Sequence, residues 1–144
     1  MKVGIIGSGG REHSLCLSLK KSNKITNLYC FPGNAGTELL AQNVNIELTN
    51  FVKLRDFIRQ NQIDIIVIGP EKPLVDGLVD YLEKNEIKVF GPNKIAAQLE
   101  GSKIFTKNLC KKYNIPTADF GIFKNLEESK SFLQKCNYPI VIKA

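Results

Sequence analysis

The run Ile63-Asp-Ile-Ile-Val-Ile68 constrains the fold more than any other segment of the sequence. Five of its six residues are isoleucine or valine, whose β-branched side chains favour strands. A nearly continuous aliphatic run of this length is typical of a strand that is covered on both faces, as in a parallel sheet between two layers of helices. We therefore expect this strand near the centre of an α/β sheet.

Further short β-branched or aromatic runs predict the other strands, at residues 2–6, 27–31, 44–48 and 87–90. They alternate with stretches whose apolar residues recur at helical spacing, of which the clearest are 51–58, with Thr49 or Asn50 as the cap, and 74–82. Residues 14–19 fit a strand or a helix, and we assign them to a helix because a βαβ unit requires one there. The order predicts a parallel sheet with helices on both faces.

The pattern changes after Gly91-Pro92. Two short helices are expected at 93–99 and 102–113, and Pro116 then interrupts the chain. The remaining residues suggest a strand, a helix and a strand, at 118–123, 126–136 and 140–143. A lone two-stranded unit is marginal in stability. We therefore expect one complete domain over residues 1–101 and the incomplete beginning of a second over 102–144.

Composition excludes several classes of protein. The chain has 144 residues, of which 43% are hydrophobic, enough to bury one ordinary core. Its net charge of +6 comes from lysines spread along the chain, without the basic stripe and interleaved aromatics of a nucleic-acid binder. No apolar run approaches the roughly 20 residues that cross a bilayer, and the amino terminus does not resemble a signal peptide. We expect a cytoplasmic protein with no nucleic-acid or membrane partner.

The four cysteines, Cys16, Cys30, Cys110 and Cys136, show no Cys-x-x-Cys spacing, and the chain has a single histidine. A zinc site and a disulfide framework are therefore not expected. Each cysteine lies in an apolar stretch, where a free thiol behaves as a small hydrophobic group. We predict four reduced, buried thiols and no metal site.

The glycine-rich turn Gly7-Ser8-Gly9-Gly10 follows the first predicted strand and precedes a helix that we expect to begin near Arg11. Free amides and the positive end of the helix dipole favour an anion at such a turn. The turn departs from the dinucleotide fingerprint, because Glu12 stands at the third glycine position and strand 27–31 is followed by no acidic residue. A phosphate site is favoured over a nicotinamide dinucleotide site, and a turn without a ligand remains an alternative.

Two further turns are expected at the same edge of the sheet, because the carboxyl ends of parallel strands face one way. They are residues 32–36 and 69–73, after the predicted strands 27–31 and 63–68. Asn34 offers donors and acceptors, Glu71 a carboxylate for hydroxyls or an amine, and Arg11 a fork for phosphate. For Glu12 and His13, a purely structural place in the first helical turn is an equally good interpretation.

Seven ordered motifs give the whole chain a specific resemblance: Gly-Gly-Arg-Glu-His at 9–13, Pro-Gly-Asn-Ala-Gly at 32–36, Gly-Pro-Glu-x-Pro-Leu-Val at 69–75, Phe-Gly-Pro at 90–92, Ala-Ala-Gln-Leu-Glu-Gly-Ser-Lys at 96–103, Ile-Pro-Thr-Ala at 115–118 and Ile-Val-Ile-Lys-Ala at 140–144. Together they resemble the amino-terminal third of the glycinamide ribonucleotide synthetases, which are ATP-grasp ligases. The resemblance implies a Rossmann-like pre-ATP-grasp domain followed by the start of an ATP-grasp domain.

The resemblance also implies a reaction: glycine is joined to 5-phosphoribosylamine with conversion of ATP to ADP and phosphate, in purine biosynthesis. By similarity, the substrate-binding residues are Gly9, Gly10, Arg11, Glu12, His13, Asn34, Gly36, Glu71 and Pro73. The ATP phosphates are expected to meet Lys103 and Lys143. The family's glycine-rich lid and its Mg²⁺ ligands are expected beyond Ala144, in the remainder of the ATP-grasp domain, so this chain by itself is expected to be inactive.

Two other functions remain open at this point. One is a stand-alone module that binds a phosphorylated ligand and has no catalytic activity. The other is a related ATP-grasp enzyme that acts on a different purine intermediate or on a carboxylate, although the turn at 32–36 argues against it.

Overall fold

The computed structural model describes residues 1–143 and contains a five-stranded parallel sheet in the order β3-β2-β1-β4-β5. The strands are β1 (Lys2–Gly7), β2 (Asn27–Pro32), β3 (Gln42–Asn43), β4 (Ile65–Ile68) and β5 (Val89–Phe90). This is the order of the first five strands of a doubly wound dinucleotide-binding fold. The predicted α/β class and its parallel sheet are confirmed.

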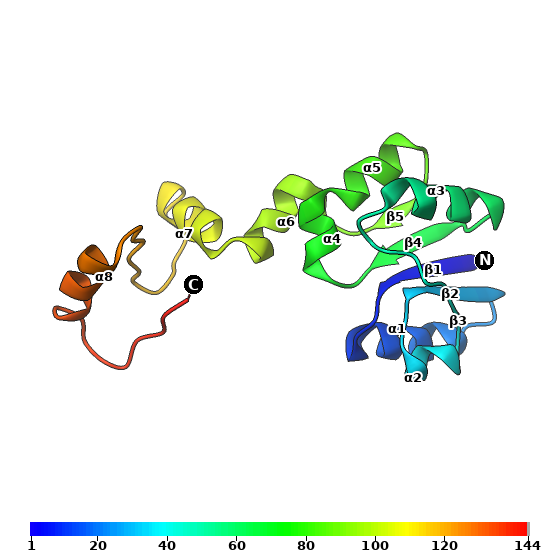
Figure 1. Ribbon diagram of the computed structural model, residues 1–144, viewed down its shortest axis with the longest axis horizontal. Helices are drawn as coiled ribbons and strands as arrows, with labels where there is room; N and C mark the ends of the chain where they lie inside the picture. Colours follow the sequence, from blue (N-terminus) through cyan, green and yellow to red (C-terminus); the bar gives the residue numbers. More distant parts are fainter. Residues whose placement is uncertain (144) are drawn as a thin grey trace. The chain divides into compact units, whose positions relative to one another are not determined.

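Helices cover both faces of this sheet (Figure 1). One face carries α1 (Gly10–Lys20) and α2 (Ala35–Glu38), and the other carries α3 (Phe51–Gln60), α4 (Glu71–Asp76) and α5 (Leu78–Lys84). The first unit ends with α6 (Lys94–Gly101), and the second contains α7 (Lys103–Lys112) and α8 (Leu126–Leu133). The assignment of residues 14–19 to a helix is confirmed, as is the cap of α3, where Asn50 Oδ1 accepts the Lys53 amide hydrogen.

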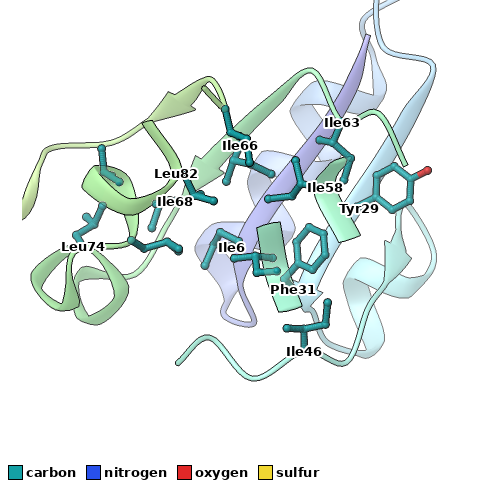
Figure 2. Packing of buried hydrophobic residues seen from close by; sticks show 14 of the residues in the cluster. Ile6, Tyr29, Phe31, Ile46, Ile58, Ile63, Ile66, Ile68, Leu74 and Leu82 are labelled. Carbon is teal, nitrogen blue, oxygen red and sulfur yellow. The ribbon is translucent and has the colours of Figure 1, made fainter. Parts of the chain in front are cut away.

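The larger part of the core lies between the sheet and α3, α4 and α5 (Figure 2). Phe31 and Ile66 are fully buried there, and Leu54 of α3 belongs to the same buried cluster. Phe57 packs edge-on against the ring of Phe31, with ring centroids 5.6 Å apart. Burial of a large apolar side chain contributes about 1.5–3 kcal/mol to the stability of the folded state. This layer of side chains therefore stabilises the packing of the three helices on the sheet.

A smaller core fills the opposite face, where α1 packs on β1 and β2 through Val3, Ile5, Cys16, Leu28 and Cys30. Burial of the two thiols raises the pKa of each, and raises that of Cys30 to about 12. All four cysteines are free, as expected, but Cys110 and Cys136 are only half-buried, which corrects the prediction that all four are buried. They lie in the second unit, whose described residues bury no side chain completely.

The predicted third strand at 44–48 is wrong, because only Gln42–Asn43 pairs with β2. The chain leaves the sheet after Asn43, and Ile46 then enters the core at 4% exposure. Apolar and polar residues therefore alternate here because an extended connection packs on the core through Val44, Ile46 and Leu48. Alternation alone does not separate such a connection from a strand.

Two other differences concern helices and the end of the chain. The apolar face at 74–82 belongs to two helices, since Gly77 breaks the segment with a φ of 96°. The predicted strands at 118–123 and 140–143 are absent from the described residues, and α8 ends at Leu133 instead of 136. No neighbouring strand is present there to satisfy their backbone groups, which is the physical reason that strand propensity fails.

The chain divides into two compact units, one over residues 1–101 and one that begins at Ser102. All of the buried core residues belong to the first. Among the helices of residues 1–143, none has the length and apolar character needed to cross a membrane.

Candidate functional site

A hollow of about 540 Å³ opens in the first unit where β1 and β4 end. Residues 7–12 form one wall, residues 70–73 and Asp76 form another, and Leu48 and Thr49 complete the lining. Both walls are turns at the carboxyl ends of parallel strands, where ligands bind in open α/β sheets. The first wall continues into α1, whose first amides have no partner within the helix and point out of its amino-terminal end.

The three turns singled out in the sequence are neighbours at this edge. Gly33 donates its amide hydrogen to the Gly7 carbonyl at 3.1 Å, which joins the turn after β2 to the turn after β1. Arg11 Nη1 donates to the Gly69 carbonyl at 2.6 Å, which joins the turn after β1 to the turn after β4. The three turns therefore meet at one edge of the sheet, as expected, but residues 32–36 do not line the hollow that the other two turns share, which corrects the expectation of a single site formed by all three.

Glu12 lies under the glycine-rich turn, and its side chain is 4% exposed. Its Oε2 accepts the Gly9 amide hydrogen at 2.6 Å. The carboxylate thus occupies the Gly9 amide, which is not available to an anionic ligand. The amides of Gly10 and Arg11 remain for a ligand.

Asn34 holds the turn after β2 against the turn after β1. Its Oδ1 caps α2 by accepting from the amides of Gly36 and Thr37, and its Nδ2 donates to the Ser8 carbonyl at 2.8 Å. A Cβ added to Gly36 would lie 3.1 Å from the ring of His13, so the two residues are in close contact. Within the described part of the chain, the lining of the hollow does not include His13, Asn34 or Gly36.

The hollow carries charges of both signs. Arg11 and Lys72 are cationic, whereas Glu12, Glu71 and Asp76 are anionic. Lys72 pairs with Asp76 at 2.8 Å across one turn of α4, and its side chain is 77% exposed, so the pair contributes little to stability. The exposed carboxylate of Glu71 at the start of α4 faces no such partner among the described ion pairs. A ligand with an anionic end and a polar or amine end would match this lining.

Comparison with known proteins identifies the family of this chain from its sequence. Residues 1–100 match the family described as phosphoribosylglycinamide synthetase, N domain, and residues 101–144 match its ATP-grasp (A) domain. The chain belongs to the phosphoribosylglycinamide synthetase family. Family membership therefore covers both compact units, and the family's two domains meet within one residue of the division between those units.

Curated relatives in this family support the same conclusion. The phosphoribosylamine–glycine ligase of Clostridium acetobutylicum is 50% identical over 146 residues, which include 100% of this chain and 35% of the relative. The ligase of the same name from Caldanaerobacter subterraneus is 49% identical over 100% of this chain and 34% of its own length. The chain thus spans about a third of the length of the curated phosphoribosylglycinamide synthetases it matches.

Solved structures agree on the fold. The crystal structure of phosphoribosylamine–glycine ligase from Thermotoga maritima matches with a TM-score of 0.69 and 33% identity, over 95% of this chain and 31% of that chain. N5-carboxyaminoimidazole ribonucleotide synthetase from the same organism also gives a TM-score of 0.69, at 19% identity over 96% of this chain and 37% of that chain. The likeness at 19% identity shows the fold alone. The sequence, and not the fold, therefore distinguishes the phosphoribosylglycinamide synthetase family from its structural neighbours.

The two lysines that the resemblance assigns to ATP lie in the part matched by the family's ATP-grasp domain. Lys103 begins α7 and Lys143 follows the last helix, and both are exposed. Within residues 1–143, no three His, Cys, Asp or Glu side chains form a group that could hold a metal ion.

Three residues of the lining lie outside the turns that the sequence singled out: Leu48, Thr49 and Asp76. For the first two a signal was available, since the connection after the third strand leaves from the same edge of the sheet as the other turns. The assignment of residues 44–48 to a strand concealed it. Lys72 and Asp76 were identifiable as a pair at i and i+4 once α4 was placed directly after the turn.

Proposed function

We propose that this chain forms the amino-terminal part of an enzyme that uses ATP to join glycine to 5-phosphoribosylamine, giving glycinamide ribonucleotide, ADP and phosphate. Identity near 50% to curated ligases of that name, across the whole chain, supports the assignment. Because those relatives are about three times as long, the activity belongs to the longer protein. We place the boundary of the amino-terminal domain at residues 101 and 102.

Within that reaction we assign the hollow to 5-phosphoribosylamine. The observation that carries this assignment is that the turns after β1 and β4 share one hollow at the amino-terminal end of α1. The free amides of Gly10 and Arg11 favour the phosphate, and the Arg11 side chain adds a cation next to them. Glu71 and Asp76, on the opposite wall, are suited to ribose hydroxyls or the amine.

The proposed chemistry requires the hollow to orient a nucleophile. An acyl phosphate of glycine is attacked by the amine of phosphoribosylamine, so that a carbon–nitrogen bond forms, the carbon–oxygen bond to phosphate breaks and inorganic phosphate leaves. Holding the amine in position converts an encounter between two molecules into a reaction within one complex, which supplies a large part of the rate. Residues of this chain would bind and orient the amine's ribose phosphate.

ATP supplies the phosphoryl group in this proposal, and Mg²⁺ would neutralise its charge. Lys103 and Lys143 are the candidates in this chain for contact with the ATP phosphates, because they match the family's phosphate-binding lysines. The match of residues 101–144 to an ATP-grasp domain favours this ligase over a stand-alone binding module. The match of both segments to one named family favours it over a related ligase with another substrate.

Titration of the chain with glycinamide ribonucleotide, followed by amide chemical shifts, tests the assignment of the hollow. We expect the amides of residues 8–11 and of Glu71 and Lys72 to shift with a dissociation constant in the millimolar range, about −4 kcal/mol of binding free energy. Shifts confined to other parts of the chain, or none at about 10 mM ligand, would contradict it.

Arg11→Ala should weaken this binding about tenfold, because a charge-assisted bond to phosphate contributes about 1.5–3 kcal/mol. The matched control is Arg59→Ala, since Arg59 Nη2 also donates to a backbone carbonyl, that of Asn85 at 2.9 Å, but Arg59 does not line the hollow. In the longer enzyme, Arg11→Ala should raise the Michaelis constant for phosphoribosylamine more than that for ATP. Equal effects on the two constants would count against a role on the substrate side.

A further inference from the structure

The Glu12 side chain fills a slot beneath both turns that form the hollow. It is the third residue of α1, and its carboxylate is buried at 4% exposure with Oε2 bonded to the Gly9 amide. In the ion pairs of the described residues it has no cationic partner. A buried carboxylate without a cation is costly unless hydrogen bonds and a helix amino terminus compensate it, which is the environment found here.

Glycines on both turns make room for this carboxylate. A Cβ added to Gly7 would lie 2.6 Å from Glu12 Cδ, and a Cβ added to Gly69 would overlap Oε1 and lie 2.8 Å from Cδ. At each position the three nearest atoms all belong to Glu12. Gly7 also has a φ of 128°, which favours glycine by itself, but Gly69 does not have a φ in that region. At position 69, the requirement for glycine comes from Glu12.

Arg11 and Glu12 therefore contact the same residue from consecutive positions of α1. Arg11 bonds the Gly69 carbonyl, while Glu12 packs on the Gly69 Cα. The amide of Gly69 donates in turn to the Ile6 carbonyl at 3.1 Å. The Glu12 side chain therefore lies against Gly7 of one turn and Gly69 of the other.

We propose that Glu12 is a positioning residue, whose carboxylate sets the spacing between the turns at 7–10 and 69–73 and presents the Gly10 and Arg11 amides to the ligand. This inference rests on the proposed function of the hollow. In this proposal Glu12 acts on the ligand through the two turns that it holds, whereas Glu71 would contact the ligand directly. The length of the Glu12 side chain and its acceptor oxygen are required for this spacing, and its negative charge is not.

A double-mutant cycle on the full chain, read by thermal unfolding without ligand, tests the packing. Gly69→Ala alone should lower the midpoint by on the order of 5 °C, because the new methyl displaces the Glu12 carboxylate. In a Glu12→Ala background the same change should lower the midpoint by less than half as much. Equal losses in the two backgrounds would overturn the proposal. If either variant fails to fold, hydrogen exchange of the Gly9 amide in the native chain decides instead: the bond to Glu12 requires slow exchange.

Two single variants separate reach from charge in the glycinamide ribonucleotide titration. Glu12→Gln keeps the length and an acceptor oxygen, so its affinity should stay within about threefold of the native value. Glu12→Asp keeps the charge but is shorter by one methylene, and its affinity should fall at least tenfold, about 1.4 kcal/mol. The opposite order would show that Glu12 acts by its charge on the ligand and would overturn the proposal. If the native chain itself does not bind, the assignment of the hollow fails, and the unliganded cycle still decides whether Glu12 spaces the turns.

Discussion

At the scale of single residues, the chemistry of this chain depends on which polar groups are already occupied. From the sequence, Glu12 and Asn34 are candidates for binding a ligand. In the structure, each forms hydrogen bonds with nearby backbone groups instead. In the described part of the chain, the first amides of α1 and the Glu71 carboxylate are among the groups at the hollow that have no hydrogen-bond partner. The assignment of Gly9, Gly10, Arg11, Glu12, His13, Asn34, Gly36, Glu71 and Pro73 as substrate-binding residues stays a prediction.

The buried thiol of Cys30 gives a prediction about pH. Burial raises its pKa from an ordinary value of 9.0 to about 12, because the thiolate is disfavoured in the core. The neutral form therefore stabilises the folded state fully below pH 9.0, and this stabilisation is lost as the pH rises from there toward the folded pKa. Between about pH 8 and about pH 10.5, this group alone should remove about 2 kcal/mol from the free energy of unfolding.

Urea unfolding at the two pH values measures this loss, and Cys30→Ala is the control because it removes the Cys30 thiol and leaves every other titratable group in place. The variant should be less stable at the lower pH but lose less stability as the pH rises. An identical pH dependence in the two proteins would contradict a raised pKa of Cys30 in the folded state.

At the scale of elements, short helices position the site, because the points at which they begin and end determine where the adjoining turns lie. The segment after β4 turns directly into α4, and Gly77 then redirects the chain into α5 so that both helices bury apolar residues against the sheet. The amide of Gly77 donates to the Leu74 carbonyl at 3.0 Å, which closes the end of α4. A glycine in this left-handed conformation is a common way to end a helix.

Gly77→Ala should therefore reduce the free energy of unfolding by about 1–2 kcal/mol, since an L-residue is strained at a φ of 96°. The methyl group would also lie 3.3 Å from Lys94 Cδ, but that side chain is flexible, so the backbone is the larger cause. Gly77→Asn is the matched control, because asparagine tolerates this conformation better. Denaturant unfolding should rank the native chain first, Gly77→Asn second and Gly77→Ala last, and a reversed order of the two variants would exclude backbone strain as the cause.

At the scale of the whole molecule, the two compact units differ in how much they bury. The first unit contains both apolar clusters, whereas no residue of 102–143 is fully buried. Stability therefore resides in residues 1–101, and the site's two turns are built on that part. The unit that contains Lys103 and Lys143 has a small apolar contact between Phe123 and Phe132, with ring centroids 4.9 Å apart.

Hydrogen exchange measured along the chain should reflect this difference. The amide of Ile66, which donates to the Lys88 carbonyl at 2.9 Å in the centre of the core, should exchange only on global unfolding of the first unit. Amides of α7 and α8 should exchange at least about a thousandfold faster, because their opening exposes little apolar surface. Fast exchange across residues 65–68 would contradict an independently folded first unit.

The sequence alone determined those features that local patterns encode. Aliphatic and aromatic runs identified β1, β2 and β4, and helical spacing with a candidate cap at Thr49 or Asn50 identified α3. Seven motifs gave the resemblance to the family. Each of these signals lies within a few consecutive residues. The tertiary structure decided what depends on distant partners. Whether residues 44–48 or 140–143 form strands depends on a neighbouring strand, and whether Glu12 or Asn34 is free depends on the turns that fold against it. A side chain's type is local, but its hydrogen-bond partner is set by the packing of segments that are far apart in the sequence.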